Sequence, residues 1–303
     1  MKVLISGATG LVGKQLVEYL INQNHEVNIL THSQSKATIF NHKKVKSFFW
    51  DTDEQIMDKA CFARVDAIIH LAGATISKRW TKGYKKQIID SRVNSTKLLF
   101  NAVRELPAHQ IKHFICASAI GIYPDSLTEK YTESYHGHSD YFLADVVEKW
   151  EQTADFFESL HIKVTKLRTG LVLARAGGAF PLMVNPVKKY IGANFGSGKQ
   201  IYSWIHIDDL VRMYAFVLMH ELDGVFNAVA SNPVTCAQLM QAIANQVGSK
   251  IWLPNIPSGL LKMAMGEMAH LVLDGQFVVN NKIKTHDFNF VYEDINTAVK
   301  SLV

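Results

Sequence analysis

The chain has 303 residues, of which 48% are hydrophobic and 19% charged, and its formal net charge is +5. This composition is typical of a folded globular protein and excludes an intrinsically disordered chain. The length allows one large α/β domain, or a nucleotide-binding domain with a smaller lobe attached. The modest positive charge favours anionic ligands, but a nucleic-acid-binding protein usually concentrates its basic residues in one stripe.

Targeting signals and metal motifs are not found in the sequence. The cysteines Cys61, Cys116 and Cys236 are spaced like neither a zinc site nor a disulfide framework, so we predict no metal. Residues 1–7 lead directly into a strand pattern and lack the layout of a signal peptide. No apolar run approaches the roughly 18 residues of a membrane helix. We expect a cytoplasmic protein with a small-molecule substrate and no nucleic-acid or membrane partner; the sequence carries no signal for the oligomeric state.

Apolar runs alternate with helical periodicity through the first half of the chain. The predicted strands cover residues 3–6, 26–31, 45–50, 67–72, 113–117 and 164–168, and the predicted helices cover residues 14–24, 87–103 and 142–159. This alternation is typical of a parallel sheet with helices on both faces. We therefore predict an α/β Rossmann fold with a doubly wound parallel sheet, which binds ligands at the carboxyl ends of its strands.

The pattern changes after Thr169. The elements predicted there are strands over residues 202–207 and 225–230 and helices over residues 208–220 and 293–302. We expect Asp208 to cap the first of these helices. The predicted domains are a dinucleotide-binding Rossmann domain over residues 1–170, with residues 200–235 returning to its sheet, and a smaller C-terminal substrate-side lobe from residues 171–199 and 236–303.

A glycine motif, Gly7-Ala8-Thr9-Gly10-Leu11-Val12-Gly13, lies between the first predicted strand and the first predicted helix. Gly7 permits the tight turn after the strand, Gly10 lets a pyrophosphate approach the backbone, and Gly13 lets the helix pack on the strand. The start of the helix offers free N–H groups and a partial positive charge to the phosphates. The motif, with Thr9, Leu11 and Val12 between its glycines, predicts a dinucleotide site.

The end of the second strand is expected to contact the adenosine ribose. In NAD-binding proteins an acidic residue about 20 residues after the motif binds the ribose 2′-hydroxyl, but residues 31–36 contain no acid. The donors available to a 2′-phosphate are Thr31, His32, Ser33 and Lys36. We therefore predict NADP as the cofactor. The backbone of Leu71, Ala72 and Gly73, after the fourth strand, is expected beside the nicotinamide ribose.

The Gly-x-x-Gly-x-x-Gly spacing resembles that of the extended short-chain dehydrogenases/reductases. Further segments resemble an atypical subfamily, the NADP-binding "epimerase family" named as nucleoside-diphosphate-sugar epimerases, which carries a C-terminal domain of unknown function. These segments are Arg79-Trp80, Ser91-Arg92, Ser118-Ala119-Ile120-Gly121, Leu167-Arg168-Thr169-Gly170, Trp204-Ile205-His206, and Leu273-Asp274-Gly275-Gln276. The resemblance covers nearly the whole chain and implies a Rossmann fold with an NADP-linked activity.

The resemblance also implies catalytic positions. A serine after the fifth strand binds the reacting oxygen of the substrate, which indicates Ser118 with Tyr123 beside it. A Tyr-x-x-x-Lys pair on the next helix moves the proton; Tyr141 matches the tyrosine, but Asp145 stands in place of the lysine. A nearby carboxylate raises the pKa of a tyrosine, which opposes its use as a base.

Arg92 stands where the superfamily spacing places an asparagine. It is predicted either to bind a carboxylate or phosphate of the substrate, or to form an ion pair within the helix layer. The basic residues 78–86 form either a solvated helix face or a phosphate-facing surface.

We therefore expect an NADP-dependent oxidoreductase or epimerase acting on a small carbonyl or sugar-nucleotide-like substrate. The alternative, favoured by the altered Tyr-x-x-x-Lys pair, is a non-catalytic NADP(H)-binding redox sensor or interaction protein.

Overall fold

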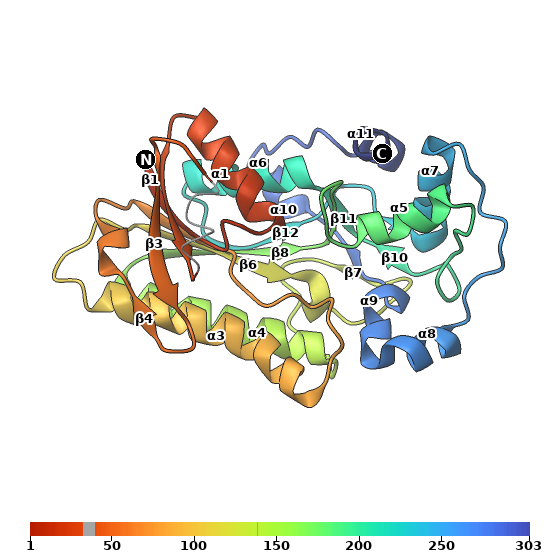
Figure 1. The fold of residues 1–303 in the computed structure, drawn as a ribbon, viewed down its shortest axis with the longest axis horizontal. Helices are drawn as coiled ribbons and strands as arrows, with labels where there is room; N and C mark the ends of the chain where they lie inside the picture. Colours follow the sequence, from red (N-terminus) through yellow and green to blue (C-terminus); the bar gives the residue numbers. More distant parts are fainter. Residues whose placement is uncertain (33–39, 138) are drawn as a thin grey trace.

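A central eight-stranded sheet organises the computed structural model, which describes residues 1–32, 40–137 and 139–303 (Figure 1). The strand order is β12-β8-β6-β5-β1-β2-β3-β4, and all neighbours are parallel except β3 and β4. The strands are β1 (Lys2–Ser6), β2 (Glu26–Thr31), β3 (Val45–Asp51), β4 (Ile56–Met57), β5 (Ala67–His70), β6 (His113–Ala119), β8 (Lys163–Thr169) and β12 (Gly224–Ala228). The chain winds outward in both directions from β1, which confirms the predicted doubly wound Rossmann fold.

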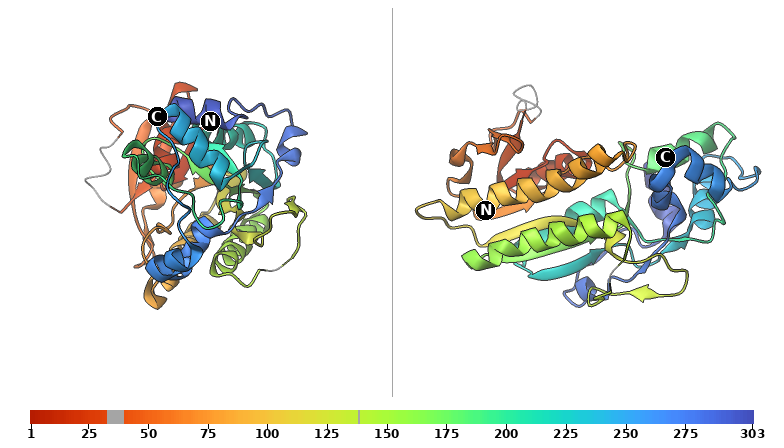
Figure 2. Two further views of the ribbon diagram at one scale, coloured as in Figure 1. Left: turned by 90° about the vertical axis from the view of Figure 1, so that its right-hand side faces the viewer. Right: turned by 90° about the horizontal axis from the view of Figure 1, so that it is seen from below.

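Helices cover both faces of this sheet (Figures 1 and 2). Helices α1 (Leu11–Asn22) and α6 (Ile207–Met219) lie on one face, and α3 (Lys82–Arg104) and α4 (Phe142–Ala154) lie on the other. The strand β1 shows why: Val3 and Ile5 join the core under α1 and α6, whereas Leu4 joins the core under α3 and α4. Successive side chains of a strand point to opposite faces, so an uninterrupted apolar strand requires two cores.

Apart from α6, β12 and α10, which pack at the central sheet, much of the chain after β8 builds the end of the molecule that lies at the right in Figure 1. Helices α5 (Phe180–Lys188), α7 (Cys236–Gln246) and α11 (Ile295–Leu302) share a separate hydrophobic core. The smaller elements are β7 (Lys130–Tyr131), β9 (Leu171–Leu173), β10 (Ile201–Tyr202), β11 (Trp204–His206), β13 (Val234–Thr235), β14 (Phe277–Val278), α8 (Ser258–Met265), α9 (His270–Leu273), α10 (Asn281–Lys284) and the 3₁₀ helices η1 (Lys59–Phe62), η2 (Ile120–Ile122), η3 (Asp155–Leu160) and η4 (Gly266–Ala269).

The starts of several helices differ from the sequence predictions, and those of α3 and α6 show the physical reason. Helix α3 begins at Lys82, five residues before the predicted start at residue 87, because the hydroxyl of Thr81 accepts a hydrogen bond from the backbone N–H of Tyr84 at 3.1 Å. The basic residues 82–86 therefore lie in its first turns. Helix α6 is capped by His206 and not by Asp208, since His206 Nδ1 accepts from the backbone N–H of Asp208 at 3.1 Å. Burial lowers the pKa of His206, which keeps Nδ1 available as an acceptor.

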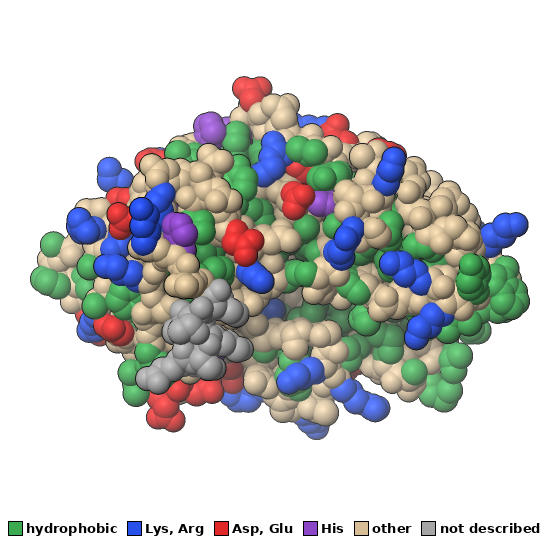
Figure 3. All heavy atoms as spheres, turned by 45° about the horizontal axis from the view of Figure 1, so that its top comes forward, with side chains coloured by type: hydrophobic (Ala, Val, Ile, Leu, Met, Phe, Trp, Pro, Cys, Tyr) green, Lys and Arg blue, Asp and Glu red, His purple; other side chains and the backbone are tan. Residues whose placement is uncertain are grey.

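The surface carries both signs of charge. On the face shown in Figure 3, Lys and Arg side chains are interspersed with acidic ones and do not form a single stripe. Large hydrophobic side chains are also exposed around α5 and the segment after α7, including Leu182, Tyr190 and Trp252. Within the described part of the chain, no helix is long and apolar enough to cross a membrane.

His113 is a buried histidine that links β6 to β8. The hydroxyl of Thr165 donates to the backbone oxygen of Leu222, so His113 Nε2–H donates to Thr165 Oγ1 at 2.6 Å. His113 Nδ1 has no hydrogen-bond partner in the described structure. Burial lowers the pKa of His113 to about 4, so this histidine is neutral in the folded protein at neutral pH.

The folded protein should therefore lose stability in weak acid. The pKa of His113 in the folded state lies below the unfolded value of about 6.5, so its contribution is present above pH 6.5 and is lost as the pH falls toward 4. In urea unfolding at pH 7.5 and pH 5.5, His113 should lower the free energy of unfolding by about 1 kcal/mol at the lower pH. In His113→Gln the loss between the two pH values should shrink by that amount; an unchanged loss would contradict the assignment.

Candidate functional site

The glycine motif forms a closely packed turn between β1 and α1. Gly7 has φ +71°, and a Cβ there would lie 2.7 Å from the carbonyl carbon of Leu71. A Cβ at Gly13 would lie 2.2 Å from the oxygen of Gly7. Both positions therefore require glycine, since neither backbone neighbour can move without shifting β1, β5 or α1.

The start of α1 fits a dinucleotide phosphate. Gly10 is the exposed N-cap residue, has no side chain to cap the helix, and no acidic residue lies in the first turn. An added Cβ at Gly10 would meet only the oxygen of Gly7, at 3.2 Å, so the outer side of this backbone is open. The free N–H groups of the first turn are suited to bind an anion. Thr9, Leu11 and Val12 are half-buried around this opening.

His70 supports the turn from below, a role that sequence reasoning missed. It is fully buried at the end of β5. Its Nδ1 lies 2.6 Å from Ser6 Oγ and its Nε2 lies 3.0 Å from Ser95 Oγ. Burial lowers the pKa of His70 to about 3, so the neutral ring bridges β1, β5 and α3. The sequence carries no signal for this role, because Ser6 and Ser95 are far from His70 in the chain and only the fold brings them together.

The end of β2 presents His32 to solvent. Its ring stacks on Trp50 with a centroid separation of 6.1 Å and an interplanar angle of 13°. The acidic residue next to Trp50 is Asp51. Its Oδ1 accepts hydrogen bonds from the backbone N–H groups of Asp53 and Glu54, and these bonds lower the pKa of Asp51. This carboxylate is therefore held in its own turn. Thr31 is buried, while the predicted donors Ser33 and Lys36 lie outside the described residues.

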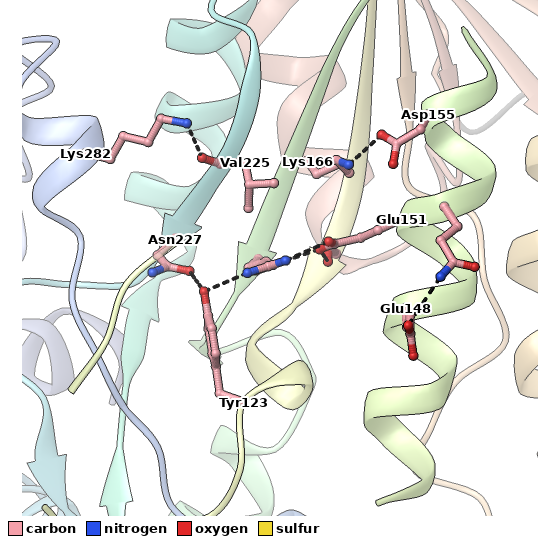
Figure 4. Close-up of polar contacts among 11 residues, drawn as sticks. Tyr123, Glu148, Glu151, Asp155, Lys166, Val225, Asn227 and Lys282 are labelled. Atoms are coloured by element: carbon pink, nitrogen blue, oxygen red, sulfur yellow. Dashed lines mark hydrogen bonds and ion pairs between the residues drawn. The ribbon is translucent and has the colours of Figure 1, made fainter. Parts of the chain in front are cut away.

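Tyr123, Glu151 and Asn227 belong to a buried polar network (Figure 4), which also includes Ser118 and Arg168. Ser118 donates to Glu151 Oε1, and Arg168 forms a bidentate ion pair with the Glu151 carboxylate at 2.8 and 2.9 Å. The hydroxyl of Tyr123 accepts from Arg168 Nη1 at 3.0 Å and donates to Asn227 Oδ1 at 2.8 Å. Both hydroxyl protons are thus used within the protein, and donation of either one to a substrate, which stays a prediction, requires one of these bonds to be exchanged.

A cavity of about 540 Å³ lies beside this network. It is bounded by the start of α3, by η2, by the start of α4 and by the segment around α9. The residues that line it are Trp80, Lys85, Gly121, Tyr123, Ser139, Asp140, Tyr141, Phe142, Leu143, Asp145, Glu267, His270, Asp274 and Gln276. Because Gly121 follows the carboxyl end of β6, the cavity opens at the same sheet edge as the glycine turn after β1.

Tyr141 lies at the N-cap of α4 and faces this cavity. Burial and the nearby carboxylates of Asp274 and Asp125 raise its pKa. Lys149 does not take the place of the missing lysine, because its Nζ pairs with Asp145 at 2.8 Å on the exposed side of α4. Tyr141 is therefore placed as a hydrogen-bond donor and not as an anion at neutral pH.

Arg92 lies under the backbone of Gly73. Its Nη1 donates to the backbone oxygens of Ile88 at 2.9 Å and Ala74 at 3.2 Å, and its guanidinium lies 5.0 Å from the ring centre of Trp150. Burial lowers its pKa to about 10. In the described part of the chain no carboxylate forms an ion pair with it, so the predicted ion pair within the helix layer is not observed. Gly73 itself is exposed, with Leu71 and Ala72 half-buried behind it.

Metal ligands do not converge in this structure: residues 1–32, 40–137 and 139–303 contain no group of three or more His, Cys, Asp or Glu side chains able to hold an ion.

Comparison with known proteins gives the family. Residues 3–228 match the NAD dependent epimerase/dehydratase family, and residues 256–302 match a domain of unknown function, DUF1731. The chain belongs to the NAD dependent epimerase/dehydratase family. The resemblance drawn from the glycine spacing and from the segments around Ser118, Trp204 and Leu273 is therefore confirmed.

Relatives and solved structures agree along the whole chain. Epimerase family proteins of Staphylococcus saprophyticus and Staphylococcus haemolyticus are 37% and 38% identical, with 99% of this chain and 98% of each relative covered. The crystal structure of human epimerase family protein SDR39U1 (isoform 2) with NADPH is similar with a TM-score of 0.86 and 28% identity, covering 100% of this chain and 99% of that one. A nucleoside-diphosphate sugar epimerase from Corynebacterium glutamicum is similar with a TM-score of 0.79 and 30% identity over 58% of its own chain.

The close approach at the glycine turn has a measurable consequence. Gly7→Ala should destabilise the protein by about 2 kcal/mol or more, because the new Cβ meets the backbone of Leu71 and the residue is held at positive φ. Gly83→Ala is the matched control: Gly83 lies in α3 with nothing within 4 Å of its Cβ position, so it should be neutral or stabilising by up to about 1 kcal/mol. Urea unfolding of both variants tests this, and equal effects would refute the packing argument.

Proposed function

We propose that this protein is an NADP(H)-dependent oxidoreductase or epimerase that acts on a small carbonyl or sugar-nucleotide-like substrate in the cavity beside α4. The observation that carries the proposal is the shared sheet edge. The open start of α1 and the cavity with Tyr141 both lie at the carboxyl ends of the parallel strands. Ligands of doubly wound sheets bind at this edge.

The residues of the glycine turn fit the cofactor. The backbone from Gly7 to Gly13 would hold the pyrophosphate, and the segment Leu71, Ala72 and Gly73 would border the nicotinamide ribose. When bound, the cofactor supplies or accepts a hydride at its nicotinamide ring. His32 supports NADP because it stands at the end of β2, where an NAD-binding protein carries an acid, and its ring is positioned by Trp50. The similar human structure contains NADPH.

The cavity supplies the polar groups toward a substrate. Tyr141 donates a hydrogen bond to the reacting oxygen. Arg92 does not line the cavity, but it lies under Gly73 and has no carboxylate partner among the described residues, so its charge would attract an anionic group such as a carboxylate or phosphate. The Ser118–Glu151–Arg168–Tyr123 network lies beside the cavity, which Tyr123 lines, and Ser118 or Tyr123 donates to the substrate only by exchanging one of its internal bonds.

Cofactor preference is tested by fluorescence titration with NADPH and NADH. The wild-type protein should bind NADPH more tightly, because residues 31–36 contain no acid to repel the 2′-phosphate. His32→Asp should weaken NADPH binding by about tenfold or more and improve NADH binding, since it restores a ribose-binding acid and repels the phosphate. His109→Asp, at an exposed position after α3, should leave both affinities unchanged. Equal binding of the two cofactors by the wild type would refute the NADP assignment.

Turnover is tested with Tyr141→Phe. With NADPH and 2,3-butanedione, or with NADP and UDP-glucose, the variant should lose at least about tenfold in kcat while its affinity for NADPH stays within threefold, because only the hydroxyl group is removed. The matched control is Tyr190→Phe, since Tyr190 is exposed far along the chain after α5. Tight NADPH binding without turnover of any carbonyl or sugar nucleotide would favour the non-catalytic redox sensor.

A further inference from the structure

His270 and Asp274 form a side-chain pair inside the cavity that the proposed function has not yet used. The two residues lie one helical turn apart at the ends of α9, and His270 Nδ1 is 2.8 Å from Asp274 Oδ2 and 3.0 Å from Oδ1. The imidazole also packs against the ring of Tyr141, with a centroid separation of 4.8 Å. His270 Nε2 has no hydrogen-bond partner among the described residues. The carboxylate thus holds one ring nitrogen and leaves the other available in the cavity.

Short bonds from other elements fix the position of this pair. The oxygen of Val272, in α9, accepts from Tyr202 Oη at 2.7 Å and from Gln200 Nε2 at 2.8 Å. The backbone N–H of Gly275 donates to Asp125 Oδ1 at 2.7 Å. A Cβ at Gly275 would lie 2.3 Å from the N of Ile201, so the chain after Asp274 runs directly against β10. A side chain held through this many packed partners is preorganised for chemistry.

The charges around the pair favour a histidine that exchanges protons. The Asp274 side chain is 15% exposed, and its pKa is raised by burial and by Asp125, against the lowering effect of His270 and Lys262. The other charged groups that line the cavity have partners of their own: Lys85 pairs with Glu267 and lies over Phe142, Asp145 pairs with Lys149, and Asp140 is also engaged within the protein. Among the described lining residues, His270 is the one histidine, and its imidazole ring carries one nitrogen that can donate a proton and one that can accept it.

We propose that His270, oriented by Asp274, is the acid–base residue of this cavity and carries out the proton transfer that Tyr141, without a lysine at position 145, is not suited to perform. The proposal rests on the proposed function. In the reducing direction the Nε2–H bond of the imidazolium breaks, its electron pair stays on nitrogen, and a new O–H bond forms on the reacting oxygen; the two electrons for the carbonyl carbon arrive with the hydride. Oxidation runs the same transfer backwards, with neutral Nε2 as the base. Tyr141 donates a hydrogen bond to the same oxygen.

The first experiment compares variants of the full-length protein. With NADPH and 2,3-butanedione, or NADP and UDP-glucose, His270→Gln should lose about 100-fold or more in kcat while NADPH affinity stays within threefold. Asp274→Asn should lose about tenfold and shift to lower pH the limb that His270 governs, because the neutral amide no longer stabilises the imidazolium. That limb is the basic one in the reduction of 2,3-butanedione and the acidic one where neutral Nε2 is the base. His109→Gln, outside the cavity, should match the wild type. A His270→Gln variant within threefold of wild-type kcat overturns the proposal.

The second measurement requires no substrate. Long-range ¹H–¹⁵N spectra of the ¹⁵N-histidine-labelled protein, assigned with His270→Gln, should show His270 at pH 8 protonated on Nδ1 and unprotonated on Nε2, and Asp274→Asn should abolish this preference. A proton on Nε2 in the wild type overturns the proposal. If no probe is turned over by the wild type but the Nδ1–H form is found, the proposed function fails while the arrangement of His270 stands; if turnover is found with the wrong tautomer, the reverse holds.

Discussion

The buried ion pair between Arg168 and Glu151 is the interaction on which the centre of the molecule depends. Removing two charges from water costs several kcal/mol per ion, which is offset only when every remaining lone pair and proton is bonded. Ser118, Tyr123 and Asn227 provide those bonds. The network thereby joins β6, β8, α4 and β12, and Asn227 Nδ2 extends it to the backbone oxygen of Val279 after β14. Both the sheet and the C-terminal segment are held against the same charge pair.

This constraint explains the form of the candidate site. Because α4 is anchored at Glu151, its N-terminus and Tyr141 are held beside Gly121, just after the carboxyl end of β6. The other side of the cavity comes from the end of the chain, where α9 is bonded to Gln200 and Tyr202. The cofactor turn is built separately, by the contact of Gly7 with Leu71 and by the neutral His70 beneath it. The site therefore combines a rigid nucleotide turn with a cavity closed by the C-terminal segment.

Asp145 stands where a Tyr-x-x-x-Lys pair has its lysine, and another region of the fold offers a proton acceptor. A lysine one turn after Tyr141 would lower the pKa of the tyrosine, whereas here burial and carboxylates raise it. A tyrosine in this state donates a hydrogen bond but does not act as a base, so an active enzyme needs another proton acceptor. The cavity has one in His270, which comes from a region that matches a domain of unknown function. The two halves of the chain are in this view both required for one chemical step.

Local pattern was sufficient for a large part of this protein. The alternation of strands and helices predicted the Rossmann fold. The glycine spacing between β1 and α1 predicted the turn and, together with the other matching segments, the family. Strand period, helix period and glycine conformation are properties of neighbouring residues, so a local pattern is enough to reveal them. Starts of helices were less well predicted: Thr81 and His206 cap α3 and α6 through side chains whose role depends on backbone direction.

The remaining features join residues far apart in sequence. Ser118 meets Glu151, His70 meets Ser95, and Tyr141 meets His270 only after folding. Burial then decides the charge of each group, and burial is a property of the whole tertiary structure, which no local pattern contains.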